Sequence, residues 1–177
     1  MLVVIGKLKS LDEVVAVRGE LEAAGARLVL TNGCFDLLHV GHVRYLQAAR
    51  GLGDALVVAV NADVSVRALK GEGRPINSET DRAEVLAALA SVDFVTIFHA
   101  QRITELVRAI RPHIYVKGGD YTIDTLNPEE VAALREVRAG IRILPLVPGK
   151  STTATIQKMQ LGEHEKSPRD SSPFPRS

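Results

Sequence analysis

The sequence lacks several features that would assign it directly to a class of protein. One cysteine among 177 residues excludes an internal disulfide framework and suits a reducing compartment. No apolar run approaches the roughly 20 residues that span a bilayer, and the apolar start of the chain is too short for a secretory signal. The charges nearly cancel, with 22 Lys and Arg against 21 Asp and Glu, so nothing draws the whole chain to nucleic acid or anionic membranes. We therefore expect a cytoplasmic protein that has no membrane or nucleic-acid partner and binds its anionic ligands at a local site.

The sequence does contain short aliphatic runs that alternate with longer amphipathic stretches. The runs are rich in β-branched residues and lack polar alternation, which is typical of strands buried in a parallel sheet. We predict a doubly wound, Rossmann-like α/β fold, in which right-handed helical crossovers join five parallel strands and helices cover both faces. The predicted strands are 28–30, 55–60, 94–98, 114–116 and 141–144. Three predicted helices are 41–51, 79–90 and 101–110. A further helix is predicted from a capping box at Ser10 to about residue 24, and another begins at Asn127-Pro128.

The end of the chain departs from this alternation. Residues 162–177 hold three of the eight prolines and four serines, and Phe174 is their one strongly apolar residue. Such a composition buries too little apolar surface to order a backbone. We expect a single domain over residues 1–161 and a disordered tail over 162–177.

The segment 31–42 is the first candidate for phosphate binding. It leaves the first predicted strand and enters a helix, where Gly33 permits a tight turn and Gly41 removes a side chain at the helix end. Free N–H groups and the helix dipole favour an anion there, and His39 and His42 can donate hydrogen bonds to it. Two other interpretations remain open. The histidines are solvent-exposed or cap the turn, or they bind zinc with a third ligand that the sequence does not identify.

Two later segments resemble phosphate loops less specifically. Residues 116–121 combine a lysine with two glycines, which also suit a common turn. Residues 149–153 offer three hydroxyls at a helix start, either as a phosphate cradle or as ordinary caps. They are not a P-loop, because position 144 is leucine where that motif needs glycine. A dinucleotide fingerprint is also disfavoured, since 51–53 and 71–73 each lack the third glycine.

Further features carry charge or reactivity. Residues 67–75 predict a basic, glycine-containing loop, either solvated or acting as an arm that supplies countercharge to a triphosphate. Arg82, in the first turns of the next helix, is either a surface arginine or part of the same site. No histidine and carboxylate are evidently arranged around Cys34, so we expect a mostly buried thiol rather than a nucleophile.

Two of these segments resemble a known family. Residues 33–42 resemble the GxFDxxHxGH signature of the nucleotidylyltransferase superfamily, a version of its HIGH motif, and 151–153 resemble its second signature, a Ser/Thr-rich turn before a C-terminal helix. Two signatures in the right order and on the right predicted elements are far more specific than either alone. Within the superfamily, the chain is similar over about residues 10–160 to the heptose 1-phosphate adenylyltransferases. That similarity rests on residues 31–33, 61–63, 69–75 and 116–121.

This resemblance implies a reaction. AMP would pass from ATP to D-glycero-β-D-manno-heptose 1-phosphate by direct in-line attack, without a covalent enzyme intermediate, to give ADP-heptose and pyrophosphate. The activity often forms the C-terminal half of a bifunctional protein with a sugar kinase and feeds lipopolysaccharide synthesis, so this chain would be a stand-alone form. Mg²⁺ would arrive with ATP, and a homodimer is expected. The alternatives are a cytidylyltransferase acting on glycerol 3-phosphate or another phosphorylated alcohol, and a nucleotide-binding regulator without turnover.

The resemblance also implies roles for individual residues. The expected catalytic and phosphate-neutralising residues are His39, His42, Lys70 and Arg82. The expected nucleotide-binding residues are Thr31, Asn32, Gly33, Phe35, Gly41, His42, Lys117, Gly118, Asp120, Ser151, Thr152 and Thr153. On the sugar side we expect Asn61, Asp63 and Lys70. No general base is needed, because a sugar phosphate is already a nucleophilic anion, so Asp36 is expected to order its turn. No metal site made only of protein groups is expected.

Overall fold

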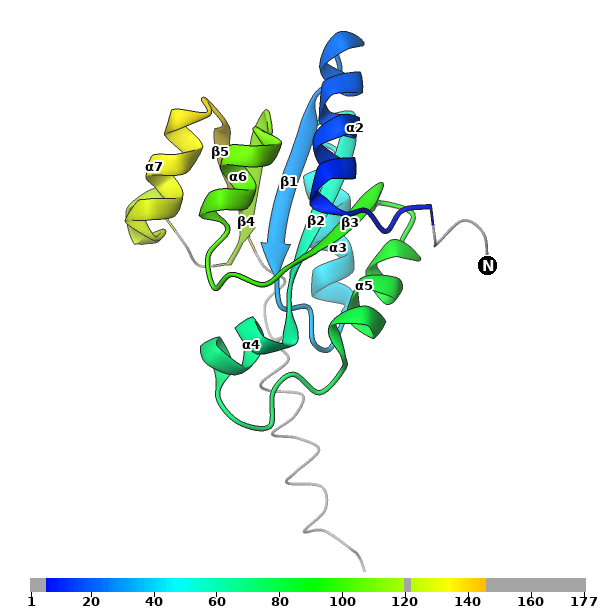
Figure 1. Cartoon of the computed structure of the whole chain (residues 1–177), viewed down its shortest axis with the longest axis vertical. Coiled ribbons are helices and arrows are strands. Elements are labelled where there is room, and N and C mark those ends of the chain that lie inside the picture. Colours follow the sequence, from blue (N-terminus) through cyan, green and yellow to red (C-terminus); the bar gives the residue numbers. More distant parts are fainter. Residues whose placement is uncertain (1–5, 120–121, 146–177) are drawn as a thin grey trace, which may run out of the picture.

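A five-stranded parallel sheet lies at the centre of the molecule, in the order β3-β2-β1-β4-β5 (Figure 1). The computed structural model describes residues 6–119 and 122–145. All five predicted strands are confirmed: β1 (Leu28–Gly33), β2 (Ala55–Asn61), β3 (Phe94–Phe98), β4 (Ile114–Gly118) and β5 (Gly140–Leu144). Since β1 pairs in parallel with both β2 and β4, the strands end at one edge of the sheet, and the loops that follow them meet there.

The helices connect these strands as the predicted fold requires. They are α2 (Leu11–Ala23), α3 (Val40–Arg50), α4 (Asp63–Lys70), α5 (Glu79–Ala87), α6 (Thr104–Ile110) and α7 (Pro128–Glu136), with a 3₁₀ turn η1 (Ile123–Thr125). The predicted caps form at two of them. Ser10 and Glu13 make a reciprocal capping box at α2, and the Asn127 side chain accepts hydrogen bonds from the first N–H groups of α7.

Helices cover both faces of the sheet, which confirms the doubly wound architecture. One buried cluster joins the sheet to α2, α6 and α7 and includes Val14, Val107 and Leu134. A second cluster, on the opposite face, includes Leu46 of α3 and Leu86 of α5. We refer to these as the α6/α7 face and the α3/α5 face. A site at the end of the strands can therefore be reached from two sides.

Three helix boundaries differ from the prediction. Residues 67–70, predicted in a loop, form the last turn of α4, because burial of Ser65 and Val66 stabilises a helix whose valines have low intrinsic propensity. The helix predicted over 101–110 begins only at Thr104, since the preceding residues carry the chain from β3 across the edge of the sheet to α6 (Figure 1). The helix predicted over 79–90 ends at Ala87.

The predicted end of the domain at residue 161 and the proposed tail over 162–177 lie outside the described residues. The 149–153 segment also lies outside them, since the described part of the chain ends at residue 145. Within the part of the chain that is described, no helix is long and apolar enough to cross a membrane.

Candidate active site

An open pocket of about 710 Å³ lies at the carboxyl edge of the sheet. This is the place where parallel α/β sheets bind ligands. Its walls come from the loops that follow β1, β2, β3 and β4 and from the start of α7. The lining residues are Asn32, Gly33, Cys34, Phe35, Asp36, His42, Tyr45, Asn61, Leu69, Lys70, Arg74, Gln101, Arg102, Lys117, Gly118, Thr125, Leu126, Asn127 and Glu130.

Two stacked histidines stand at the N-terminus of α3. The ring centroids of His39 and His42 are 3.9 Å apart, with 25° between the ring planes. His39 is the N-cap of the helix, and its Nδ1 accepts a hydrogen bond from the N–H of Gly41 at 3.1 Å. The capping interpretation of the sequence is therefore correct for His39. This capping bond occupies Nδ1 of the His39 ring.

The hydrogen bonds of the two rings determine which nitrogen carries the proton. A backbone N–H can only donate, so Nδ1 of His39 is unprotonated, and so is Nδ1 of His42, which accepts from the N–H of His39 at 3.4 Å. Both neutral rings thus carry their proton on Nε2. Burial, with the neighbouring His39 ring as a smaller cause, lowers the pKa of His42 to about 4. At neutral pH the pair is a set of N–H donors at a helix N-terminus, where the dipole already favours an anion.

Two glycines of the pocket leave room for aromatic rings. A Cβ at Gly33 would lie 3.0 Å from Cε2 of Phe35, whose backbone is left-handed at φ 48° and whose ring meets His42 edge-on. A Cβ at Gly118 would lie 2.7 Å from Cε2 of Tyr45. Glycine at these positions lets the rings form the floor of the pocket.

Tyr45 ties α3 to the sheet below the pocket. Its hydroxyl lies 2.6 Å from the hydroxyl of Thr31 and donates to the carbonyl of Val116 at 3.0 Å. Burial raises the pKa of Tyr45 to about 12, so the phenol stays protonated and keeps this bond. Thr31 is fully buried beneath it.

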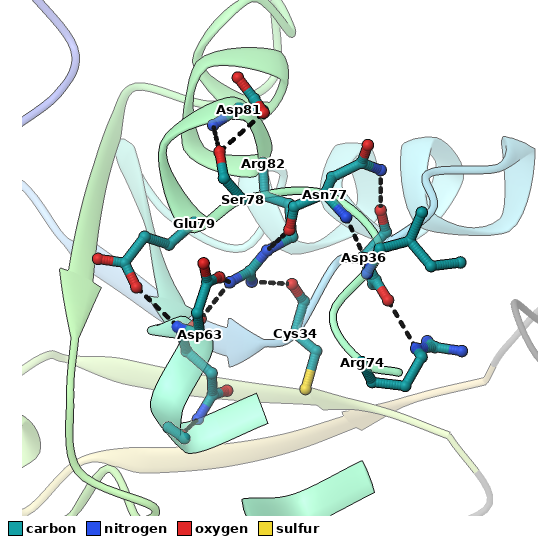
Figure 2. Close-up of polar contacts among 12 residues, drawn as sticks. Cys34, Asp36, Asp63, Arg74, Asn77, Ser78, Glu79, Asp81 and Arg82 are labelled. Atoms are coloured by element: carbon teal, nitrogen blue, oxygen red, sulfur yellow. Dashed lines mark hydrogen bonds and ion pairs between the residues drawn. The ribbon is translucent and has the colours of Figure 1, made fainter. Parts of the chain in front are cut away.

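Asp36 fixes the loop that precedes α5. Its Oδ1 accepts hydrogen bonds from the backbone N–H groups of Ile76 and Asn77 at 2.8 and 3.0 Å, and its Oδ2 pairs with Nε of Arg74 at 2.7 Å (Figure 2). Since Asp36 is 4% exposed, these contacts confirm that it orders its turn. They also hold Arg74 in the wall of the pocket.

Arg82 connects three segments of the chain (Figure 2). Its guanidinium donates to the carbonyl oxygens of Cys34, Asn61 and Asn77 and to the carboxylate of Asp63, the last at 2.8 Å. The residue is 2% exposed. The loops after β1 and β2 and the start of α5 are thereby joined through one side chain.

A polar group occupies the α6/α7 face of the pocket. Asn32 Oδ1 accepts from the hydroxyl of Tyr115 at 2.7 Å and from Nζ of Lys117 at 3.2 Å. Burial lowers the pKa of Lys117, and the charge of Glu130 opposes that shift. Asn61 donates from Nδ2 to Oγ of Ser65 at 2.8 Å.

Residues 30–160 match the family model described as Cytidylyltransferase-like. The chain belongs to this family. Members are nucleotidyltransferases, and the cytidylyltransferase-like chain is assigned to that class of enzyme.

Curated relatives of this cytidylyltransferase-like protein are bifunctional proteins. The chain is 46% identical to the bifunctional protein HldE of Aliarcobacter butzleri over 156 residues, which are 88% of this chain and 32% of that protein. It is 50% identical to HldE of Pelobacter propionicus over 154 residues, 86% of this chain and 31% of that protein. The chain thus spans about a third of the length of the curated relatives that it matches.

Solved structures agree with the family and the fold. The lipopolysaccharide core biosynthesis protein of Thermoplasma volcanium aligns with a TM-score of 0.56 and 28% identity, covering 70% of this chain and 98% of that one. Pantoate-beta-alanine ligase of Francisella tularensis aligns with a TM-score of 0.55 at 12% identity, over 88% of this chain and 77% of that one. The second likeness concerns the fold alone.

The cytidylyltransferase-like pocket brings together many of the predicted site residues. Eight of them line it: Asn32, Gly33, Phe35, His42, Asn61, Lys70, Lys117 and Gly118. His39 stacks on His42 but is not itself in the lining. Asp120, Ser151, Thr152 and Thr153 lie outside the described residues.

Four predicted site residues lie elsewhere. Thr31 and Gly41 are buried in β1 and at the start of α3, outside the pocket lining. Asp63 is paired with Arg82 instead of facing the pocket. Arg82 is buried, and its guanidinium is directed to protein oxygens.

Sequence reasoning missed several lining residues. Tyr45 lies within a predicted helix whose apolar pattern hides the role of its hydroxyl. Cys34, expected to be mostly buried, is only partly exposed, and it lines the pocket wall. Gln101, Arg102, Asn127 and Glu130 come from the loop after β3 and the start of α7. No local motif marks them. They reach the pocket only because both segments cross the edge where β1 and β4 end.

No described residues form a group of three histidine, cysteine or acidic side chains that could hold a metal ion. The zinc interpretation of the histidine pair therefore gains no third ligand from residues 6–119 and 122–145. Phosphate binding remains the function that fits two N–H donors at a helix N-terminus.

The state of His42 predicts a pH dependence. Its pKa of about 4 lies below the ordinary 6.5, so between these values the unfolded chain binds a proton that the native chain does not. The free energy of unfolding should therefore fall as pH is lowered from 6.5 to 4. An NMR titration of the His42 imidazole should have its midpoint near 4. His42→Gln should flatten the pH slope of stability measured by urea unfolding, whereas a midpoint near 6.5 would contradict the buried neutral state.

The network of Arg82 predicts a structural loss. Arg82→Lys keeps the charge but cannot donate to four oxygens at once, and we expect the free energy of unfolding to fall by about 2–4 kcal/mol in chemical denaturation. The matched control is Arg44→Lys on the exposed side of α3, which should change it by less than about 0.5 kcal/mol. Unchanged stability combined with lost ATP affinity would instead assign Arg82 to direct phosphate contact.

Proposed function

We propose that this chain transfers AMP from ATP to D-glycero-β-D-manno-heptose 1-phosphate and releases pyrophosphate. The observation that carries the proposal is the stacked pair His39 and His42, which bears two Nε2 protons at the N-terminus of α3, where His42 lines the same pocket as the cations Lys70 and Arg74. Such an array suits a triphosphate and its developing charge. The similarity to HldE proteins and to a lipopolysaccharide core biosynthesis protein supports a heptose acceptor.

The reaction needs positioning more than acid–base chemistry. A phosphate oxygen of the sugar phosphate attacks the α-phosphorus of ATP. The bond from that phosphorus to the oxygen bridging to the β-phosphate breaks, and the electron pair leaves with pyrophosphate. No proton must be removed from the nucleophile, so the protein's task is to bring two anions together and stabilise the charge that moves to the leaving group.

Each part of the pocket has a role in this proposal. The Nε2–H groups of His39 and His42 donate to phosphate oxygens, most strongly in the transition state, while Lys70 and Arg74 neutralise the triphosphate. Arg82 acts as a positioning residue that holds the loops around it. Mg²⁺ enters with ATP as part of the substrate, with the phosphates as its main ligands. Ser151, Thr152 and Thr153 remain the proposed partners of the β- and γ-phosphates, and Asp120 of the nucleoside.

Two other functions use the same histidine pair. A cytidylyltransferase acting on glycerol 3-phosphate shares both signatures, but the HldE relatives favour the heptose substrate. A nucleotide-binding regulator would bind ATP without turnover. We further propose that the protein works in the cytoplasm as a homodimer.

Pyrophosphate release tests the reaction directly. With Mg²⁺, ATP or CTP is supplied against heptose 1-phosphate or glycerol 3-phosphate. We expect release with ATP and heptose 1-phosphate, because the proposed acceptor and nucleotide must be present together. Release with CTP and glycerol 3-phosphate would assign the alternative. ATP binding without release in any combination would assign the regulator.

The histidine role predicts a kinetic signature. His42→Ala should lower kcat by about 10²–10³-fold, as loss of a preorganised donor to a developing oxyanion does elsewhere, and change KM for ATP by only a few fold. The control is His99→Ala, since His99 is exposed and lies outside the pocket lining. A raised KM with unchanged kcat would show that His42 only binds ground-state ATP.

A further inference from the structure

A second pocket, of about 480 Å³, opens at the amino edge of the sheet, where the strands begin. Its walls come from one side of α2, the end of α6 and the segments that lead into β4 and β5. Its charged and titratable lining residues are Arg18, Glu22, Arg111, His113 and Arg138. Three arginines from three separate segments of the chain thus line one cavity, at the opposite edge from the candidate active site.

Two of these arginines reach the pocket in the same way. α6 leads directly into β4, and α7 leads directly into β5. The two strands are neighbours in the sheet, and the two helices lie side by side (Figure 1). The N–H of Gly140 also donates to the carbonyl of His113 at 2.8 Å, which joins the two connections. Arg111 and Arg138, one in each connection, are therefore brought to the same cavity.

Both of these arginines have a left-handed backbone. The angle φ is 53° at Arg111 and 59° at Arg138. Glycine is favoured at such a position after a helix, because a Cβ crowds the neighbouring carbonyl oxygen there. Each arginine therefore lowers stability relative to glycine, and the chain carries one at both helix ends. Backbone strain of this kind gathers at functional sites.

The helix dipoles do not account for the two side chains. A cation at the carboxyl end of a helix is favourable, but Arg108 already lies in the last turn of α6 and Arg135 in that of α7. Among the described residues, none forms an ion pair or a side-chain hydrogen bond with the guanidinium of Arg111 or of Arg138. The positive charge of both groups is thus open to a ligand.

Arg18 and His113 add donors to the same cavity. Nε of Arg18 donates to the carbonyl of Arg111 at 2.9 Å, while its buried Nη1 lies 3.0 Å from Oε2 of Glu22 without the alignment of a hydrogen bond. Nδ1 of His113 accepts from the N–H of Leu28 at 2.9 Å, so the neutral ring carries its proton on Nε2. Burial, with the charge of Arg18 as a smaller cause, lowers the pKa of His113 and keeps the ring neutral near pH 7.

We propose that this amino-edge pocket is a second anion site, which binds a dianionic phosphoryl group. Three arginines against Glu22 leave two positive charges in the cavity, and a phosphate monoester carries a charge of about −2 near neutral pH. Guanidinium groups present several N–H donors each, so three of them suit the three terminal oxygens of a phosphoryl group better than the two of a carboxylate. The inference does not depend on the proposed function, because the two pockets lie at opposite edges of the sheet.

Inorganic phosphate tests the site, with NMR signals of the histidine side chains as the readout. Phosphate is added to the full chain near neutral pH, and chloride at the same ionic strength controls for screening. We expect a saturable shift of the His113 signals, which report on this pocket separately from His42 in the other. Arg111→Gly and Arg138→Gly should each weaken the Kd read from His113 about tenfold or more, the loss expected for a charge-assisted hydrogen bond. Arg44→Gln, exposed on α3, should leave that Kd unchanged.

Urea unfolding of the same variants gives a second readout of opposite sign. Because glycine relieves the left-handed strain, Arg111→Gly and Arg138→Gly should unfold at a urea concentration equal to or above that of the wild type while phosphate binding weakens. Arginines that only stabilise the helix ends would instead lower the midpoint when removed, which would contradict a ligand-binding role. Asparagine, which tolerates this conformation, replaces glycine in any variant that fails to fold.

The ligand series decides the class of anion. Repeating the titration with glycerol 3-phosphate separates two sources of the phosphoryl group: tighter binding than inorganic phosphate supports an ester, and weaker binding supports the free ion. Acetate that shifts His113 with an equal Kd would overturn the phosphoryl class. A His113 signal that phosphate shifts no further than chloride does, or a Kd unchanged in both arginine variants, would overturn the site. Absence of pyrophosphate release would contradict only the proposed function.

Discussion

One guanidinium holds the candidate site together. Parallel strands deliver their loops to a common edge, but nothing in the sheet ladder fixes how those loops sit relative to one another. Arg82 does so by donating to the backbone carbonyls of Cys34 after β1, of Asn61 at the end of β2 and of Asn77 before α5. Because the guanidinium is buried and directed at carbonyl oxygens, its positive charge is stabilised by backbone dipoles and by the carboxylate of Asp63. By binding the carbonyl of Cys34, Arg82 holds the backbone of the signature segment 33–42 in place.

The mixture of charges and amides in the pocket suits a reaction between two anions. The lining contains the cations Lys70, Arg74, Arg102 and Lys117, the carboxylate of Glu130, and the carboxamides of Asn32, Asn61, Gln101 and Asn127. A uniformly cationic pocket would bind both substrates tightly and in many orientations. A pocket in which amides and one carboxylate stand among the cations favours fewer orientations, and orientation is where much of the rate of a bimolecular transfer arises. The neutral histidine pair adds donors without adding fixed charge.

The sequence predicted those parts that depend on local pattern. Five β-branched runs, the capping box at Ser10 and the Asn127-Pro128 helix start all reflect short-range chemistry, and all appear in the structure. The histidine pair was found because its signature is continuous in sequence. Glu130 and Gln101 were missed because their place in the pocket follows from two crossovers. The protein partners of Arg82 were not predicted, since burial of a side chain under three segments leaves no mark in a linear pattern.

The contacts of Asp36 bear on how this protein family can vary. By binding Arg74 and the N–H groups of Ile76 and Asn77, Asp36 anchors the far end of the connection between α4 and α5. The near end is anchored by α4 itself, so only Gly71–Gly73, which are exposed, span freely between them. Insertions or deletions confined to these three positions would change the length of the connection while Lys70 and Arg74 keep their places. Evolution and protein engineering can therefore alter this loop without altering the charge that faces the substrate.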